Sequence, residues 1–146
     1  MITVILADDH AILRDGLRFL LEAAGDIKII SMAANGQEAI DQARQHCPDV
    51  IVMDISMPVM SGIEATKHIC KICENTKVAI LSMHHTTEYV QRALEAGAAG
   101  YLLKDSAGSE LVAAIRALNA GKRYISKSVS TTFGDSDSLR SRNGIN

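Results

Sequence analysis

Four short apolar runs in this sequence are each followed at once by a residue that can react or carry charge. VILA precedes Asp8 and Asp9, VIVM precedes Asp54, VAIL precedes Ser82, and GYLL precedes Lys104. If the runs are strands of a parallel α/β sheet, right-handed crossovers point every strand the same way and gather these residues along one edge. The sequence therefore predicts a site with three carboxylates, a hydroxyl and an ammonium group.

Phosphoryl chemistry suits this set of groups. Carboxylates this close together repel one another unless a pKa rises, a cation binds or a Lys or Arg lies opposite. An ionised Asp at a buried strand end can attack phosphorus if the incoming charge is neutralised, and we interpret Asp54 as that nucleophile. Asp8 and Asp9 are candidate ligands of Mg²⁺, which prefers oxygen atoms. Lys104 can neutralise a phosphoryl oxygen, and Ser82 can donate a hydrogen bond to another.

Each of these residues has an ordinary structural interpretation when it is taken alone. An Asp after a strand is commonly a helix cap or a turn residue, and Ser82 by itself is more often a capping hydroxyl. The coincidence at four strand ends is what favours a functional site. The sequence contains no glycine-rich loop of the P-loop or dinucleotide-binding type, which disfavours a nucleotide cradle.

The elements that must position these residues alternate between strand-like and helix-like patterns five times. The expected strands are residues 3–7, 27–33, 50–53, 78–81 and 101–103. The segments between them carry apolar residues at the spacing of a buried helix face, as in Leu13, Leu17 and Leu20. The run 50–53 is continuously apolar, as expected for a central strand covered on both faces. The pattern predicts a doubly wound α/β fold with five parallel strands.

Composition favours one soluble domain with an aliphatic core. Of 146 residues, 47% are hydrophobic and only 3% aromatic. The formal net charge of −2 gives no basic footprint, so we do not expect this chain to bind nucleic acid by itself. No apolar stretch approaches the roughly 18 residues that span a bilayer, and the first residues lack the charged region of a secretory signal. We expect a cytoplasmic protein with no membrane partner.

The cysteines are three in number, Cys47, Cys70 and Cys73. An odd count without a signal peptide fits reduced thiols better than a disulfide framework. The Cys70-x-x-Cys73 pair falls late in an expected helix, away from the N-terminal end where the dipole lowers a thiol pKa. We interpret both as packing residues. A zinc site that used His46 or His68 would lack a fourth ligand.

A resemblance to the receiver domain of bacterial two-component response regulators is carried by the segments VILADDHAILRDGL, PDVIVMDISMPVMSGIEA, ILSMHH and EAGAAGYLLKDS. The DDH-x-x-x-R-D-G-L opening, GYLLKD and GKRYIS are particularly similar to the NarL/LuxR-type transcriptional regulators. The resemblance covers residues 1–126 and implies a flavodoxin-like sheet of strand order 2-1-3-4-5. We expect the polar remainder, residues 127–146, to be a linker or a disordered tail.

The resemblance also implies how the acidic residues act. Asp54 would be phosphorylated by a partner histidine kinase. Asp9, Asp54 and the backbone carbonyl of Ser56 would ligate Mg²⁺, and Asp8 would contribute directly or through water. A protein of this kind catalyses at most its own phosphorylation and dephosphorylation, so we do not class it as an enzyme.

On the same resemblance, Ser82 and Lys104 would engage the phosphoryl group, and Tyr101 would turn inward and couple the site to the surface. Taken alone, Tyr101 could also be an ordinary half-buried strand aromatic. Ser56 and His84 each lie two residues past a site residue, where a side chain can screen or orient the hydrolytic water. We expect both to tune the lifetime of the phosphoryl group.

Two features depart from the family pattern. Many receivers have Pro after the lysine, but here Asp105 follows Lys104, and a cis bond before a non-proline residue costs roughly 2.5–4 kcal/mol. NarL/LuxR-type regulators also continue into a helix-turn-helix DNA-binding domain, whose paired amphipathic helices are missing after Gly121. We expect a receiver cut from a longer transcription factor, with DNA binding in the missing domain. The alternative is a single-domain receiver that signals by protein contact.

Two other classes of protein fit this sequence less well than the receiver. A phosphatase of the haloacid dehalogenase type also uses a strand-end Asp with Mg²⁺, but it needs a second Asp where this chain has Ser56. A flavodoxin-like module that binds flavin would need aromatic residues to stack on the ring, and this chain has no Trp and few aromatics. The sequence identifies neither the kinase nor the target genes, and homodimerisation on phosphorylation stays open.

Overall fold

Strands and helices alternate along the chain in the computed structural model, which describes residues 1–84 and 86–129. The elements are β1 (Ile2–Ala7), α1 (Ala11–Glu22), β2 (Ile27–Ala33), α2 (Gly36–His46), β3 (Val50–Asp54), α3 (Gly62–Ile72), β4 (Lys77–Ser82), α4 (Thr87–Glu95), β5 (Gly100–Leu103), the 3₁₀ turn η1 (Lys104–Ser106), α5 (Ala107–Asn119) and β6 (Tyr124–Ile125). In the described ranges no helix is both long enough and apolar enough to cross a membrane. Most of the expected tail, from residue 130 on, lies outside the described residues.

The sheet is parallel throughout and has the order β2-β1-β3-β4-β5-β6. The predicted order 2-1-3-4-5 is confirmed for the first five strands. The prediction of five strands omitted β6, because a segment of two residues has no periodicity to detect. Backbone hydrogen bonds hold β6 in place: the Tyr124 N–H donates to the Ala99 carbonyl over 3.1 Å, and the Ser126 N–H donates to the Tyr101 carbonyl over 2.8 Å.

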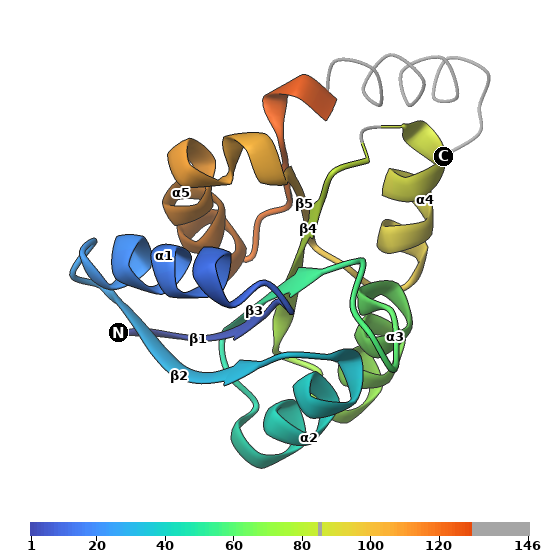
Figure 1. Ribbon diagram of the computed structural model, residues 1–146, viewed down its shortest axis with the longest axis horizontal. Helices are drawn as coiled ribbons and strands as arrows, with labels where there is room; N and C mark the ends of the chain where they lie inside the picture. The colour runs from blue at the N-terminus through green and yellow to red at the C-terminus, as the bar shows by residue number, and fades with distance from the viewer. Residues whose placement is uncertain (85, 130–146) are drawn as a thin grey trace.

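Helices cover both faces of the sheet, and the sheet separates the core into two layers. Alternate residues of a strand point to opposite faces, so Val50 and Val52 of β3 pack with α1 and α5, whereas Ile51 and Met53 pack with α2, α3 and α4. Figure 1 shows α1 and α5 together on one side of the sheet and α2 and α3 on the other. Val129 is buried in the layer of α2, α3 and α4, three residues past the expected domain boundary at 126.

The turns that enter and leave the helices use the expected chemistry. Asn35 and Ser61 begin α2 and α3 with side-chain oxygens that accept the backbone N–H groups of Glu38 and Glu64. Gly97 follows the C-cap of α4 with a φ of 110°, in the left-handed region that favours glycine. No cis peptide bond occurs among the described residues, so the bond after Lys104 is trans.

A disulfide joins Cys47 to Cys73, across a Cα–Cα distance of 5.6 Å. The prediction of reduced thiols is therefore wrong for these two residues, and only Cys70 is a free cysteine in the described part of the chain. Both bonded cysteines are the C-cap residues of helices, α2 and α3, which pack on the same face of the sheet. This packing brings together residues 26 positions apart, and a count of cysteines cannot reveal it.

Candidate functional site

The carboxyl ends of β1, β3, β4 and β5 meet at one edge of the sheet. The strands are in register at that edge: Ala7 pairs with Met53, and Asp54 pairs with Leu81. Ser82 in turn pairs with Leu103, one residue before the lysine. Asp8 follows Ala7, Asp54 and Ser82 end their strands, and Lys104 follows Leu103. The structure therefore brings together at one edge the residues that the sequence predicts to form the site: Asp8, Asp9, Asp54, Ser82 and Lys104.

The Lys104 ammonium group lies between two buried carboxylates. Its Nζ donates a hydrogen bond to Asp54 Oδ2 over 2.9 Å and lies 3.6 Å from Asp8 Oδ2. Asp54 and Asp8 are 1% and 2% exposed, and the side chain of Lys104 is 13% exposed. A single cation thus faces two carboxylates that have almost no access to solvent.

The electrostatics of Asp54 follow from this arrangement. Burial raises the pKa of the Asp54 carboxyl, and the neighbouring carboxylate of Asp8 raises it further. The hydrogen bond and the charge of Lys104 act in the opposite direction without cancelling the effect. The site therefore destabilises the negative charge on Asp54 and favours a ligand or counter-ion that would offset it.

Asp8 is held by residues at the start of α1, and only one of its two carboxylate oxygens has a hydrogen-bond partner. Its Oδ1 accepts the backbone N–H of His10 over 2.8 Å, and the Arg14 guanidinium donates to its backbone carbonyl over 2.8 Å. Its Oδ2 is buried and has no hydrogen-bond partner in the described structure. Sequence reasoning assigned no role to His10 or Arg14, although both stand in the DDH-x-x-x-R opening and could have been found from their spacing to Asp8.

The acidic cluster can accept a divalent cation. One ligand atom from each of Asp8, Asp9, His10 and Asp54 lies within 4.8 Å of the others. A bound cation would give the unpartnered Oδ2 of Asp8 a ligand contact and would offset the excess negative charge of the carboxylates. The donor set therefore fits the Mg²⁺ ion that the sequence predicts.

The loop between β3 and α3 is tightly tied to Asp54. The Ser56 backbone N–H donates to Asp54 Oδ1 over 3.2 Å, and the side chain of Ser56 is exposed beside it. The Gly62 N–H donates to the Ile55 carbonyl over 2.9 Å, which closes the loop. Within it Val59 has a φ of 71°, a left-handed conformation that a β-branched residue rarely adopts.

The loop between β4 and α4 joins Ser82 to Tyr101. Ser82 Oγ accepts the backbone N–H of His84 over 2.9 Å, and the Tyr101 hydroxyl donates to the backbone carbonyl of His84 over 2.6 Å. Tyr101 is fully buried rather than half-buried, and burial raises the pKa of its hydroxyl. The exposed His84 ring stacks on Tyr89 of α4 with ring centroids 4.0 Å apart. Ser82 and Tyr101 therefore both bond the backbone of the same residue, one at its N–H and the other at its carbonyl.

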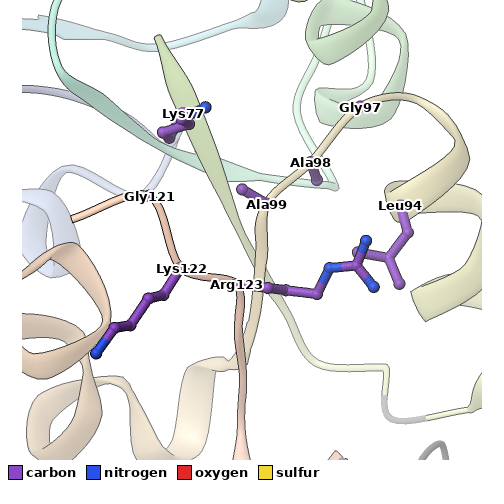
Figure 2. A pocket seen from close by; sticks show the side chains of 8 residues that line it. All are labelled: Lys77, Leu94, Gly97, Ala98, Ala99, Gly121, Lys122 and Arg123. Atoms are coloured by element: carbon purple, nitrogen blue, oxygen red, sulfur yellow. The ribbon is translucent and has the colours of Figure 1, made fainter. Parts of the chain in front are cut away.

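A cavity of about 380 Å³ at the opposite edge of the sheet does not belong to this site. It lies where β4 begins, at Lys77, and is also lined by Leu94, Lys122 and Arg123. Figure 2 shows Arg123 directed toward Leu94 while Lys122 points the other way, so the cationic groups do not converge on one ligand. The groups that can carry chemistry are at the edge that holds Asp54.

Residues 4–116 match the family of response regulator receiver domains. The chain is 40% identical over 129 residues to the response regulator UvrY of Escherichia coli, which covers 88% of this chain and 59% of UvrY. It is 44% identical over 137 residues to YxjL of Bacillus subtilis, an uncharacterized transcriptional regulatory protein, over 90% of this chain and 63% of YxjL. The chain thus spans about three fifths of these relatives' length.

Solved structures agree with the sequence comparison. The crystal structure of a two-component response regulator of the LuxR family from Aurantimonas sp. has a TM-score of 0.89 and 36% identity, covering 94% of this chain and 98% of that one. The fold and the acidic edge are those of a receiver-type signalling domain. The chain belongs to the response regulator receiver domain family, as its resemblance to that family predicted.

Proposed function

We propose that this chain is a phosphoacceptor switch in which Asp54 takes a phosphoryl group from the phosphohistidine of a sensor kinase. The observation that supports this most directly is the buried Asp54–Lys104 pair beside the unpartnered Oδ2 of Asp8. A carboxylate that is buried and crowded by another carboxylate gains when its charge is spread over a phosphoryl group and shared with cations. An inert structural ion pair would not need the second carboxylate.

In the proposed transfer, a carboxylate oxygen of Asp54 attacks phosphorus as the N–P bond to the donor histidine breaks, and the imidazole leaves with the electron pair. Mg²⁺, held by Asp9, Asp54 and the Ser56 carbonyl with Asp8 directly or through water, would supply positive charge to the phosphoryl oxygens. Lys104 would exchange its contact with Asp54 Oδ2 for a phosphoryl oxygen. The preformed ammonium needs to move only a short distance.

Ser82 and Tyr101 are the proposed reporters of phosphorylation. The Ser82 hydroxyl would rotate from the His84 backbone N–H toward a phosphoryl oxygen, and the loop that this N–H belongs to would rearrange. Because the Tyr101 hydroxyl bonds the backbone carbonyl of the same His84, loop and aromatic would move together. The site is thereby coupled to α4 and the surface beside β5.

Ser56 and His84 are proposed to tune how long the phosphoryl group persists. Both side chains are exposed at the rim of the site, where they can shield or orient water. Ser56→Ala and His84→Ala are expected to change the dephosphorylation rate measured from radiolabelled protein. Rates equal to wild type in both variants would contradict this role.

The output is proposed to be control of transcription. YxjL carries the name of a transcriptional regulatory protein, and this chain spans 63% of it. In such a protein DNA binding would belong to a further helix-turn-helix domain, and phosphorylation could act through a homodimer. A cytoplasmic location fits a kinase-fed regulator of this type. The alternative is output by direct protein contact.

Intact mass after incubation with acetyl phosphate and Mg²⁺ tests the phosphoacceptor. We expect one hydroxylamine-labile phosphoryl group on the wild-type chain and none on Asp54→Asn or in the presence of EDTA. An adduct on Asp54→Asn would assign a different nucleophile. No adduct on the wild type, together with no beryllofluoride binding, would contradict phosphorylation altogether.

A further inference from the structure

The acidic cluster that could bind a cation contains one imidazole, that of His10, among its carboxylates. Its Nδ1 is 3.2 Å from Asp8 Oδ1 and 3.4 Å from Asp9 Oδ1. The backbone N–H of the same residue donates to Asp8 Oδ1, which fixes the main chain so that the ring stays beside both carboxylates. The side chain of His10 is 64% exposed, so an ion arriving from solvent can reach its ring.

The spacing of the ligand atoms suits a first-row transition metal. Such an ion binds nitrogen and oxygen at about 2.0–2.2 Å, so two of its ligand atoms can be at most about 4.4 Å apart. The four ligand atoms of Asp8, Asp9, His10 and Asp54 lie within 4.8 Å of one another. Closing the remaining gap needs movements of a few tenths of an ångström, which the exposed side chains of Asp9 and His10 can make.

A second observation points to a ligand in the same place. Asp8 Oδ2 is buried, has no hydrogen-bond partner, and belongs to a side chain that is 3% exposed. Its nearest cation is Lys104 Nζ at 3.6 Å, beyond hydrogen-bond range. An oxygen left in this state favours a cation close to the Asp8 carboxylate, whose other oxygen, Oδ1, faces His10 Nδ1.

We propose that His10 supplies an imidazole nitrogen to this site, so that the chain binds a transition-metal ion of the Zn²⁺ or Cu²⁺ class more tightly than Mg²⁺. The inference rests on the proposed Mg²⁺ site and adds to it a determinant of metal selectivity. Mg²⁺ requires oxygen ligands and gains little from imidazole, whereas nitrogen strongly favours ions late in the first transition row. A transition metal would then compete with Mg²⁺ for the phosphoacceptor site.

The experiment compares the whole chain with a His10→Ala variant, both in a Cys70→Ser background that removes the free thiol. His46→Ala is the matched control, because it removes an exposed histidine at the far end of α2. Binding of Zn²⁺ and, separately, of Mg²⁺ is measured by titration calorimetry. The electron paramagnetic resonance spectrum of bound Cu²⁺ reports directly whether nitrogen is a ligand.

We expect His10→Ala to weaken Zn²⁺ binding on the order of tenfold or more, since loss of even an outer partner of a metal ligand costs roughly 10–100-fold. Its Mg²⁺ affinity should stay within about twofold of the parent, since imidazole is not a preferred Mg²⁺ ligand. The nitrogen coupling of Cu²⁺ should disappear in His10→Ala and persist in His46→Ala. Unchanged Zn²⁺ affinity, or an equal loss of Mg²⁺ and Zn²⁺ affinity, would overturn the inference.

Asp9→Asn and Asp54→Asn separate failure of this inference from failure of the proposed function. If both variants bind Mg²⁺ as tightly as the parent, the proposed Mg²⁺ site itself is wrong. If they lose Mg²⁺ binding while Zn²⁺ affinity does not depend on His10, only the inference about His10 fails.

Discussion

The charges of Asp8 and Asp54, at the ends of two strands, are both compensated by Lys104. Its ammonium group contacts Asp54 at 2.9 Å and lies 3.6 Å from Asp8, and these carboxylates are almost fully buried. Removing one partner of a buried ion pair is costly because the other charge stays uncompensated. Lys104 therefore has a structural role in addition to the one proposed in phosphoryl binding.

We predict that Lys104→Met lowers the free energy of unfolding by about 3 kcal/mol when Mg²⁺ is chelated. Adding Asp54→Asn to this variant should recover much of the loss, because one of the two buried charges is then removed. Urea unfolding followed by circular dichroism measures both effects. Lys67→Met, which changes an exposed lysine of α3, is the control and should change little. Equal stability of Lys104→Met and wild type would show that the pair contributes nothing.

Elements position the site through close backbone contacts. The first residue of α3, Gly62, packs directly against the last residue of β3: a Cβ atom there would overlap the Asp54 carbonyl oxygen and lie 2.9 Å from Met53 Cγ. At one edge of the sheet, β6 is fastened to α5, since the Tyr124 hydroxyl and Ser126 Oγ donate to the two carboxylate oxygens of Glu110. Both contacts fix the distance between a helix and a strand.

Gly62→Ala is expected to push α3 away from β3, because the obstacle is backbone that cannot move aside. Overpacking of this kind costs roughly 1–3 kcal/mol or more, and the displaced Asp54 should take up phosphoryl from acetyl phosphate more slowly. Gly16→Ala in α1 is the matched control: nothing lies near its added methyl group, and it should stabilise the chain by about 0.5–1 kcal/mol. Thermal unfolding measures the change in stability, and the rate of adduct formation measures the effect on Asp54. Equal stability and equal rates in Gly62→Ala and Gly16→Ala would contradict the prediction.

The β6–α5 contact predicts a pH dependence at high pH. Burial and the hydrogen bond to Glu110 raise the pKa of Tyr124 to about 12. Because this is above the ordinary tyrosine pKa of about 10, the stability it contributes is complete below pH ~10 and is lost as the pH rises through about 12.

Tyrosinate absorbance measures this titration, and the difference between wild type and Tyr124→Phe isolates the residue. In Glu110→Gln the carboxylate acceptor is gone, so Tyr124 should ionise at a lower pH than in wild type. An unchanged titration curve would mean that the contact does not persist in solution.

The whole molecule is held together by two core layers and by one covalent link. The Cys47–Cys73 disulfide joins the ends of α2 and α3 on the face that also carries α4. It lies at helix ends away from the acidic edge, because β3 and β4, which follow these helices, run from this end toward Asp54 and Ser82. The bond is therefore expected to affect stability more than phosphoryl chemistry.

We predict that reducing this bond lowers the free energy of unfolding by about 3.5 kcal/mol, the cross-linking effect expected for residues 26 positions apart. Urea unfolding with and without a thiol reductant measures the change. In the oxidised native chain one thiol, Cys70, should react with Ellman's reagent after denaturation, and Cys70→Ser should leave none. Three reactive thiols without reductant would show that the bond does not form.

Much of the fold was predictable because the periodic pattern of a long element depends on local sequence. The strand at 27–33 was predicted with its observed bounds, and the other four predicted strands to within a residue at each end. The central strands β3 and β4 are easiest to recognise, since a buried strand between helices is a continuous apolar run. The roles of Asp54, Lys104 and the other site residues remain predictions, but their meeting at one edge follows from parallel topology alone. The disulfide and β6 could not be predicted, because both depend on contacts between segments distant in sequence.

The sequence by itself determined which residues end the strands, how the elements alternate, and to which family the chain belongs. Those properties are encoded locally, in residue type and spacing. Only the tertiary structure decided that Asp8 Oδ2 is buried without a hydrogen-bond partner, that His10 lies between two carboxylates, and that Tyr101 bonds the backbone of His84. Such features depend on how the helices settle on the sheet to within an ångström, and packing of the whole chain sets those distances.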